Sequence, residues 1–217
     1  DGKTEILNNQ KPSILDTGNI SKPKPISFSS GSNLEAHAFY FEPKNQRFQS
    51  LNELPPLIVL SHGGPTSSAR SSFDPAVQFW TNRGFAVVDV NYGGSTGFGT
   101  EYRNRLNGNW GITDTQDCVE AAKHLAKNGF ADRDRLIIKG GSAGGYTTLC
   151  ALTWHDIFAA GISRYGVADL ETLARDTHKF ESKYLDSLIG PWPEKSDIYI
   201  ERSPIHHTHL LSTPMII

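Results

Sequence analysis

The chain has 217 residues, of which 37% are hydrophobic and 20% charged, and its formal net charge is −2. This length suits one domain that buries a substantial core, and the nearly balanced charge gives no reason to expect nucleic acid or a membrane as a partner. No apolar run approaches the roughly 20 residues of a membrane-spanning helix. Cys118 and Cys150 lack metal-ligand spacing, so we expect buried thiols, which suit a reducing, cytoplasmic location.

The first predicted elements are two strands, 26–29 and 34–41, with turn residues between them. A continuous apolar run at 57–60 predicts a strand that is buried on both faces. Residues 74–83 predict a short helix that ends at a glycine, and 85–90 predict the next buried strand. The two early strands are expected to form an antiparallel edge.

The second half of the chain continues the alternation of strands and helices. After a glycine-rich loop, the next predicted element is the helix 113–127, which Thr113 or Asp114 can cap. It is followed by the strand 136–139, a helix to about 155, the strand 159–163, a helical stretch at 169–187, a proline-rich loop, and a strand beginning at 215. This order predicts an α/β fold with a mostly parallel, doubly wound sheet covered on both faces.

Both ends of the chain predict a piece of a longer protein. The only methionine is Met215, and residues 1–24 are polar and punctuated by proline and glycine. The last four residues have the pattern of an opening strand. We therefore expect 1–24 to be a linker and 25–217 to be one domain whose C-terminal part is missing.

A glycine-rich corner follows the strand at 136–139. Gly140, Ser142 and Gly144 match G-x-S-x-G, in which a sharp strand-to-helix turn presents a serine hydroxyl at the top of a sheet. The following helix directs its free N–H groups at the apex, with Ala143 as the first donor. On this motif alone, a tight turn with an incidental serine remains an equal alternative.

A second motif, Ser61-His62-Gly63-Gly64-Pro65, follows the strand at 57–60. In α/β-hydrolases the loop at this place supplies the second oxyanion donor, often from an H-G-G run. With Ala143, Gly64 is the candidate for that N–H group. The two motifs occur in the expected order, which favours a nucleophilic serine at Ser142.

Competing interpretations of the glycine and histidine clusters are weaker. A dinucleotide fingerprint needs glycine where Ser142 stands, and the loop 93–99 lacks the lysine of a phosphate loop, so we expect a mobile loop over the site. His206, His207 and His209 have no carboxylate or cysteine nearby in the sequence, which favours a solvated turn over a metal site. No cofactor and no metal are expected.

The serine needs a histidine base that a carboxylate orients, and in this fold both follow the serine in the chain. No histidine after Ser142 stands behind a predicted strand with a strand-end acid before it. The acid belongs after the strand that begins at Met215. We therefore expect the aspartate and the histidine beyond residue 217, and the 217-residue chain alone to be inactive.

Taken together, the segments resemble the hydrolase domain of the prolyl oligopeptidase family of serine peptidases, above all its acylaminoacyl-peptidase and dipeptidyl-peptidase-like branch. The matching segments are 61–65, 91–99, 110–111, 132–146, 164–170 and 202–205. The resemblance implies Ser142 as the nucleophile, Ala143 and Gly64 as oxyanion donors, and Tyr146 and Tyr165 in the substrate pocket. It also implies a β-propeller before the linker 1–24. His62 replaces the tyrosine of the proline-specific branches, which weakens any expectation of proline specificity.

The function that we predict is hydrolysis of short peptides through an acyl-enzyme on Ser142. A serine esterase is the enzymatic alternative, because the same elbow and oxyanion hole cleave esters. A non-catalytic fragment or pseudoenzyme with a binding role is the alternative from another class. The expected partner is a small peptide, with no nucleic acid and no membrane, and a homo-oligomer of the full-length protein is left open.

Overall fold

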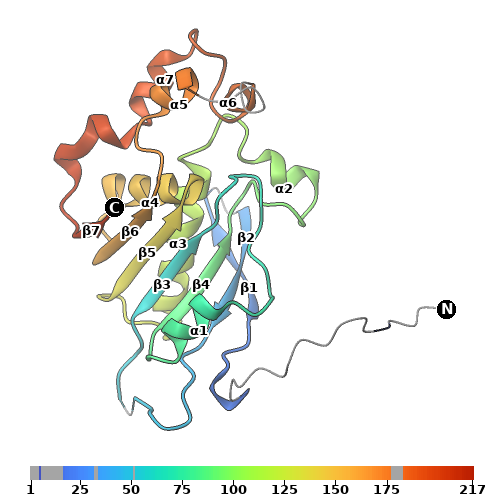
Figure 1. Ribbon diagram of the computed structural model, residues 1–217, viewed down its shortest axis with the longest axis vertical. Coiled ribbons are helices and arrows are strands. Elements are labelled where there is room, and N and C mark those ends of the chain that lie inside the picture. Colours follow the sequence, from blue (N-terminus) through green and yellow to red (C-terminus); the bar gives the residue numbers. More distant parts are fainter. Residues whose placement is uncertain (1–4, 6–16, 32–33, 51, 177–182) are drawn as a thin grey trace.

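The computed structural model describes residues 5, 17–31, 34–50, 52–176 and 183–217. The described residues form one seven-stranded sheet in the order β1-β2-β4-β3-β5-β6-β7 (Figure 1). The strands are β1 (Lys24–Ser30), β2 (Leu34–Phe41), β3 (Leu57–Ser61), β4 (Ala86–Asn91), β5 (Leu136–Gly141), β6 (Ala160–Arg164) and β7 (Met215–Ile216).

The sheet is antiparallel at one edge and parallel elsewhere. β1 pairs with β2 and β2 with β4 in antiparallel registers, whereas β4, β3, β5, β6 and β7 are parallel to one another. The central strands β3 and β4 consist largely of branched apolar residues, which suits a sheet whose two faces are both buried. The expected α/β architecture with an antiparallel edge is confirmed.

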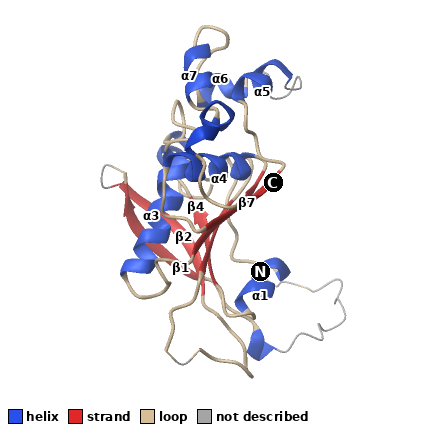
Figure 2. Ribbon diagram, turned by 90° about the vertical axis from the view of Figure 1, so that its left-hand side faces the viewer, coloured by secondary structure: helices blue, strands red, loops and turns tan. Residues whose placement is uncertain are grey.

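Helices cover both faces of the sheet and the edge at which the parallel strands end. They are α1 (Pro75–Thr81), α2 (Thr100–Asn104), α3 (Thr113–Lys127), α4 (Ala143–Trp154), α5 (Leu170–Asp176), α6 (Tyr184–Leu188) and α7 (Ser196–Glu201), with 3₁₀ turns η1 (Thr17–Asn19) and η2 (Pro204–Leu210). Figure 2 shows α3 and α4 on one face of the sheet and α1 on the other. Helices α2, α5, α6 and α7 lie beyond the carboxyl ends of the parallel strands (Figure 1).

The larger core lies between the sheet and the pair α3 and α4, and the smaller one lies under α1. Alternate residues of β3 divide between them: Val59 belongs to the larger core, whereas Ile58 packs with Val77 of α1 and Val87. Cys118 and Cys150 are buried in the larger core and form no disulfide, which confirms the expectation of buried thiols. The strand β3 is thus fixed from both sides just before the loop that carries His62.

Several predicted boundaries need correction. α3 begins after Ile112, and the Asp114 side chain accepts a hydrogen bond from Gly111 N at 2.7 Å instead of capping the helix from outside. The expected proline-rich loop before β7 contains α7 and η2. Pro204 is compatible with η2 because it lies in the first turn, where the missing N–H would have no partner within the helix. α2 was not predicted, since five residues carry too little periodicity.

Other predictions fall partly outside the described residues. The helical stretch 169–187 corresponds to α5 and α6, and residues 177–182 between them lie outside the described part of the chain. Most of the predicted linker, residues 1–4 and 6–16, is likewise outside it.

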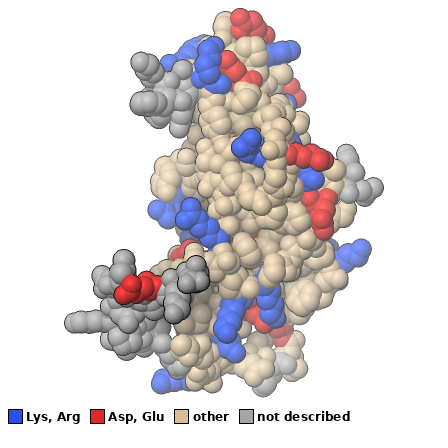
Figure 3. All heavy atoms as spheres, turned by 90° about the vertical axis from the view of Figure 1, so that its right-hand side faces the viewer, with Lys and Arg blue, Asp and Glu red and all other residues tan. Residues whose placement is uncertain are grey.

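On the face shown in Figure 3, basic and acidic side chains are interspersed across the surface and do not gather into a patch of one sign.

Candidate active site

Ser142 lies at a sharp corner between β5 and α4. Its backbone has φ 56° and ψ −124°, a left-handed conformation that a residue with a side chain seldom adopts, and its side chain is exposed. Main-chain hydrogen bonds fix the corner, from Ser142 N to Arg164 O at 3.1 Å and from Tyr146 N to Ser142 O at 3.0 Å. The neighbouring structure thus holds a strained turn whose apex is the serine hydroxyl.

The two motif glycines allow the chain to pass itself at this corner. A Cβ on Gly140 would overlap the carbonyl group of Gly144, and a Cβ on Gly144 would overlap the carbonyl group of Ser61. Both residues therefore need to be glycine for steric reasons that the turn itself creates. The second contact also brings the end of β3 against the start of α4.

The loop after β3 lies beside the serine. A Cβ built on Gly63 would be 3.7 Å from Ser142 Cβ, and Gly64 has φ 129°, a conformation open to glycine. Ala143 is the first residue of α4, so its N–H has no acceptor within the helix. The residues expected to supply oxyanion donors, Gly64 and Ala143, are therefore on the two segments that meet at Ser142.

His62 holds this loop from inside the protein. Its Nδ1 lies 2.9 Å from Gly63 O, its Nε2 lies 2.7 Å from Ser95 Oγ, and its ring stacks on Tyr92 with centroids 4.2 Å apart. Burial lowers the pKa of His62 to about 4, so the ring is neutral at physiological pH. The neutral ring donates from Nδ1 to Gly63 O and accepts at Nε2 from the Ser95 hydroxyl.

The loop 93–99 is anchored at its first half. The buried Ser95 contacts His62, and Thr96 N donates to Ser67 O at 2.7 Å. Tyr92 OH lies 3.0 Å from both His62 O and Pro65 O, which ties the end of β4 to the same loop. The expectation of a mobile loop is wrong for this half, because Ser95 is buried and hydrogen-bonded.

The sequence did not indicate that Tyr92 and Ser95 hold the loop that carries His62. Their partner His62 is about thirty residues away along the chain, so no local pattern links them.

The two tyrosines expected in the substrate pocket lie in different environments. Tyr165 has φ 41°, is 73% exposed, and packs over Gly141, where a Cβ would be 3.1 Å from the tyrosine hydroxyl. Tyr146 is 0% exposed, packs on Trp110, and donates its hydroxyl to Arg202 O at 3.0 Å. Tyr165 is therefore beside the serine and open to a substrate, whereas this geometry gives Tyr146 a packing role and does not support the expected substrate contact.

No described side chain forms a hydrogen bond with Ser142 Oγ. The histidines after the serine that the structure describes lie at the end of α4 (His155) and on η2. His207 Nε2 pairs with Glu201 O at 2.9 Å, and its ring contacts Trp154. No pairing of Ser142 with a histidine base is seen in the described part of the chain.

A carboxylate pair does accompany His206 in space, which the sequence did not predict. Asp169, Glu171 and His206 place one potential ligand atom each within 4.8 Å of one another. The Asp169 carboxylate already accepts hydrogen bonds from the N–H groups of Glu171 and Thr172 and from the Thr172 hydroxyl, as the cap of α5. This arrangement is explained by capping, and we assign no metal to it.

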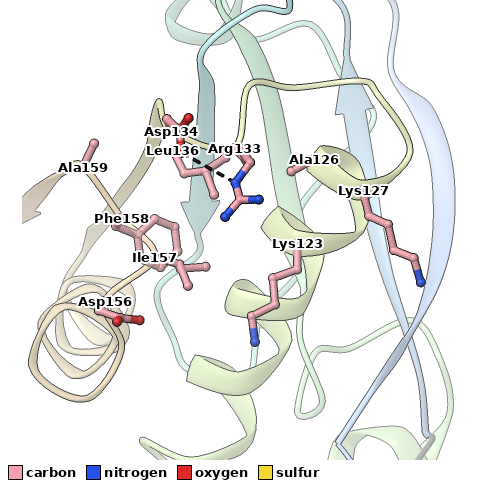
Figure 4. A pocket seen from close by; sticks show the side chains of 10 residues that line it. All are labelled: Lys123, Ala126, Lys127, Arg133, Asp134, Leu136, Asp156, Ile157, Phe158 and Ala159. Atoms are coloured by element: carbon pink, nitrogen blue, oxygen red, sulfur yellow. Dashed lines mark ion pairs between the residues drawn. The ribbon is translucent and has the colours of Figure 1, made fainter.

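A cavity of about 800 Å³ lies at the opposite end of the sheet from Ser142. Figure 4 shows that it opens between the C-terminal end of α3 and the segment before β6; its lining residues are Lys123, Ala126, Lys127, Arg133, Asp134, Leu136, Asp156, Ile157, Phe158 and Ala159. Because this cavity is at the amino ends of β5 and β6, it is separate from the candidate active site.

Comparison with known proteins identifies the family. Residues 71–217 match the model of the prolyl oligopeptidase family, which includes the serine corner and most of the segments named above. The chain belongs to the prolyl oligopeptidase family. Its sheet order and the corner at Ser142 agree with the α/β-hydrolase fold of the solved structures that it matches.

Individual members of this family are similar over most of the chain. Dipeptidyl aminopeptidase BIII of Pseudoxanthomonas mexicana is 34% identical over 168 residues, which is 75% of this chain and 24% of the relative. A puromycin-hydrolyzing peptidase of Mycobacterium tuberculosis is 43% identical with a TM-score of 0.91, over 94% of this chain and 31% of the other. An acylaminoacyl peptidase of Pyrococcus horikoshii is 29% identical with a TM-score of 0.80, over 90% and 31%.

The chain thus spans 24% to 31% of the length of these relatives. Within the described residues, none of the helices is long and apolar enough to cross a membrane.

Proposed function

We propose that the protein is a serine peptidase that cleaves short peptides through an acyl-enzyme on Ser142. The observation that carries this proposal is the strained, exposed Ser142 at the start of α4, in a chain of the prolyl oligopeptidase family. A serine at φ 56° and ψ −124° costs on the order of 1–3 kcal/mol, a cost that a purely structural turn would avoid with glycine.

In the proposed reaction the Ser142 hydroxyl attacks the carbonyl carbon of the scissile amide. The carbonyl oxygen becomes an oxyanion that accepts hydrogen bonds from the N–H groups of Ala143 and Gly64. The hydroxyl proton passes to a histidine base and then to the leaving amine, and water hydrolyses the acyl-enzyme. We propose that this histidine and its aspartate follow residue 217 in the complete protein.

We further propose that Tyr165 forms one wall of the substrate site, because its exposed ring lies over Gly141 next to the nucleophile. The names of the relatives, a dipeptidyl aminopeptidase, an acylaminoacyl peptidase and a puromycin-hydrolyzing peptidase, favour short substrates with a free or blocked amino end. A β-propeller before residues 1–24 would restrict access to such substrates. The two free thiols favour a cytoplasmic location.

The test uses the longest natural polypeptide that contains residues 1–217. A fluorophosphonate is expected to label the wild type at Ser142 and to leave Ser142→Ala unlabelled, and dipeptide and N-acyl-aminoacyl anilides are expected to be cleaved. Residues 1–217 alone should react orders of magnitude more slowly, because the proposed histidine base follows residue 217. Cleavage of ester substrates without amide cleavage would replace the peptidase by an esterase, and a folded, unlabelled wild type would indicate a protein without catalysis.

A further inference from the structure

The first two turns of α3 carry a buried carboxylate without an ion pair among the described residues. Asp117 is 6% exposed, and its Oδ2 accepts a hydrogen bond from Gly93 N at 2.6 Å. Burial raises the pKa of this carboxyl, while the nearby Arg105 acts in the opposite direction. Burial of a carboxylate destabilises the folded state unless hydrogen bonds compensate for the lost hydration. The hydrogen bond from Gly93 N is therefore important to Asp117, and equally to the position of Gly93.

The contact fixes a turn that leads away from β4. Gly93 lies against Thr113 and Arg105 so closely that a Cβ would be 2.8 Å and 3.1 Å from their side chains. Two residues later, Ser95 N donates to Tyr92 O at 2.9 Å and closes the turn. Asp117 therefore sets the position of the segment from Gly93 to Ser95 relative to α3.

The segment from Gly93 to Ser95 sets the position of His62. Ser95 is 0% exposed, and its hydroxyl lies 2.7 Å from His62 Nε2. The opposite ring nitrogen binds Gly63 O at 2.9 Å, and Gly63 packs against Ser142. One series of contacts thus leads from α3 to the backbone beside the nucleophile.

We propose that Asp117 is a positioning residue for the oxyanion loop, acting through Gly93 and Ser95 on His62 and so on the peptide between Gly63 and Gly64. The inference rests on the proposed function for its kinetic consequence, but the connection from Asp117 to His62 exists without catalysis. Rotation of one peptide group is enough to turn an N–H away from an oxyanion, so a loop held at its base by a hydrogen bond favours the transition state.

The test compares Asp117→Ala with Asp117→Asn in the longest natural polypeptide that contains the chain. The alanine removes the acceptor for Gly93 N, whereas the asparagine keeps one oxygen in place. We expect kcat to fall roughly 10- to 100-fold in Asp117→Ala with KM little changed, and to recover in large part in Asp117→Asn. Glu120→Ala is the matched control, because Glu120 lies one turn further along α3 and its partly exposed carboxylate accepts hydrogen bonds from Gln116 and Lys123, not from Gly93.

A double-mutant cycle with Ser95→Ala tests the route. If Asp117 acts through Ser95, the two alanine variants have non-additive effects on kcat, and their combination is little worse than either alone. Additive effects, or a lowered Tm with unchanged kcat per folded molecule, would overturn the proposal and leave Asp117 as a core residue.

A readout independent of catalysis separates this inference from the proposed function. Nitrogen chemical shifts of the His62 ring report its tautomer and its titration. In the wild type we expect a ring protonated at Nδ1 that stays neutral well below pH 6, and in Asp117→Ala a mixture of tautomers and a higher pKa. If the wild type lacks activity, the peptidase proposal fails while this measurement still decides the role of Asp117; unchanged His62 shifts in a folded Asp117→Ala refute it.

Discussion

The Cα of Gly144 lies directly against the carbonyl group of Ser61, so closely that no side chain fits between them. This contact joins the first turn of α4 to the end of β3. We expect Gly144→Ala to force the two segments apart and to destabilise the protein by about 1–3 kcal/mol or more, with loss of reactivity at Ser142. Thermal unfolding and fluorophosphonate labelling measure the two effects.

Gly31→Ala is the matched control for that substitution, because the nearest atom to its Cβ would be 3.7 Å away, at Gln116. A Gly144→Ala variant as stable and reactive as Gly31→Ala would contradict the close approach.

Tyr165 should influence substrate binding more than the chemical step. Its ring is exposed beside Gly141, so Tyr165→Ala removes apolar contact area from the proposed substrate wall. We expect KM to rise several-fold with a smaller change in kcat, and Tyr165→Phe to retain most of the affinity. The same KM in Tyr165→Ala and the wild type would remove Tyr165 from the substrate site.

His62 should give the protein a stability that depends on pH in a defined direction. Burial lowers the pKa of His62 to about 4, whereas the unfolded chain binds the proton near pH 6.5. The folded state therefore loses stability as the pH falls from about 6.5 to about 4, by roughly 3 kcal/mol, and keeps it above this range. Unfolding free energies measured across this range should show a smaller decrease in His62→Gln; an equal decrease would place the titration elsewhere.

Asp89 should act in the opposite sense. Its side chain, on the α1 face of β4, has no hydrogen bond or ion pair to another described residue, and burial followed by the charge of Asp74 raises its pKa to about 7. The folded state therefore binds a proton more tightly than the unfolded state, so this group's contribution to stability falls as the pH rises from about 4 to about 7. We expect Asp89→Asn to stabilise the protein by about 1–3 kcal/mol at pH 8 and much less at pH 4.

Chemical unfolding of both proteins at the two pH values measures this difference. Asp134→Asn is the control, because the Asp134 side chain is 84% exposed. A stabilisation by Asp89→Asn that is the same at pH 4 and pH 8 would mean that removal of the buried charge is not its cause.

Thr147 should matter more than its neighbour Thr148. The Thr147 hydroxyl donates to Asp114 Oδ2 at 2.6 Å, whereas the Thr148 hydroxyl donates only to Gly144 O of its own helix. Burial raises the pKa of Asp114 to about 6, and the bond from Thr147 opposes that rise. Thr147→Val leaves an acceptor unpaired in the core, so we expect the free energy of unfolding to fall by about 1–3 kcal/mol, against less than about 1 kcal/mol for Thr148→Val. Denaturant unfolding measures both values. Equal losses of stability would contradict the role assigned to the bond between Thr147 and Asp114.

The sequence by itself determined the succession of strands and helices along the chain and the serine corner, because both depend on local chemistry. A continuous apolar run such as Leu57–Leu60 is typical of an inner strand that is buried on both faces, and the glycines around Ser142 are those that a tight strand-to-helix turn requires. The short helices α2 and α7 could not be predicted from the sequence, because they have too few residues for a periodic pattern.

Only the tertiary structure decided which side chains work together. Tyr146 and Tyr165 are the same residue type close to the same corner, yet Trp110 and the carbonyl of Arg202, which is 56 residues away from Tyr146, bury the first and leave the second exposed. The hydrogen bond from Ser95 to His62 likewise joins the loops that follow the neighbouring strands β4 and β3, across 33 residues of sequence. Burial and hydrogen bonding between distant segments depend on packing in three dimensions, which a local sequence pattern does not contain.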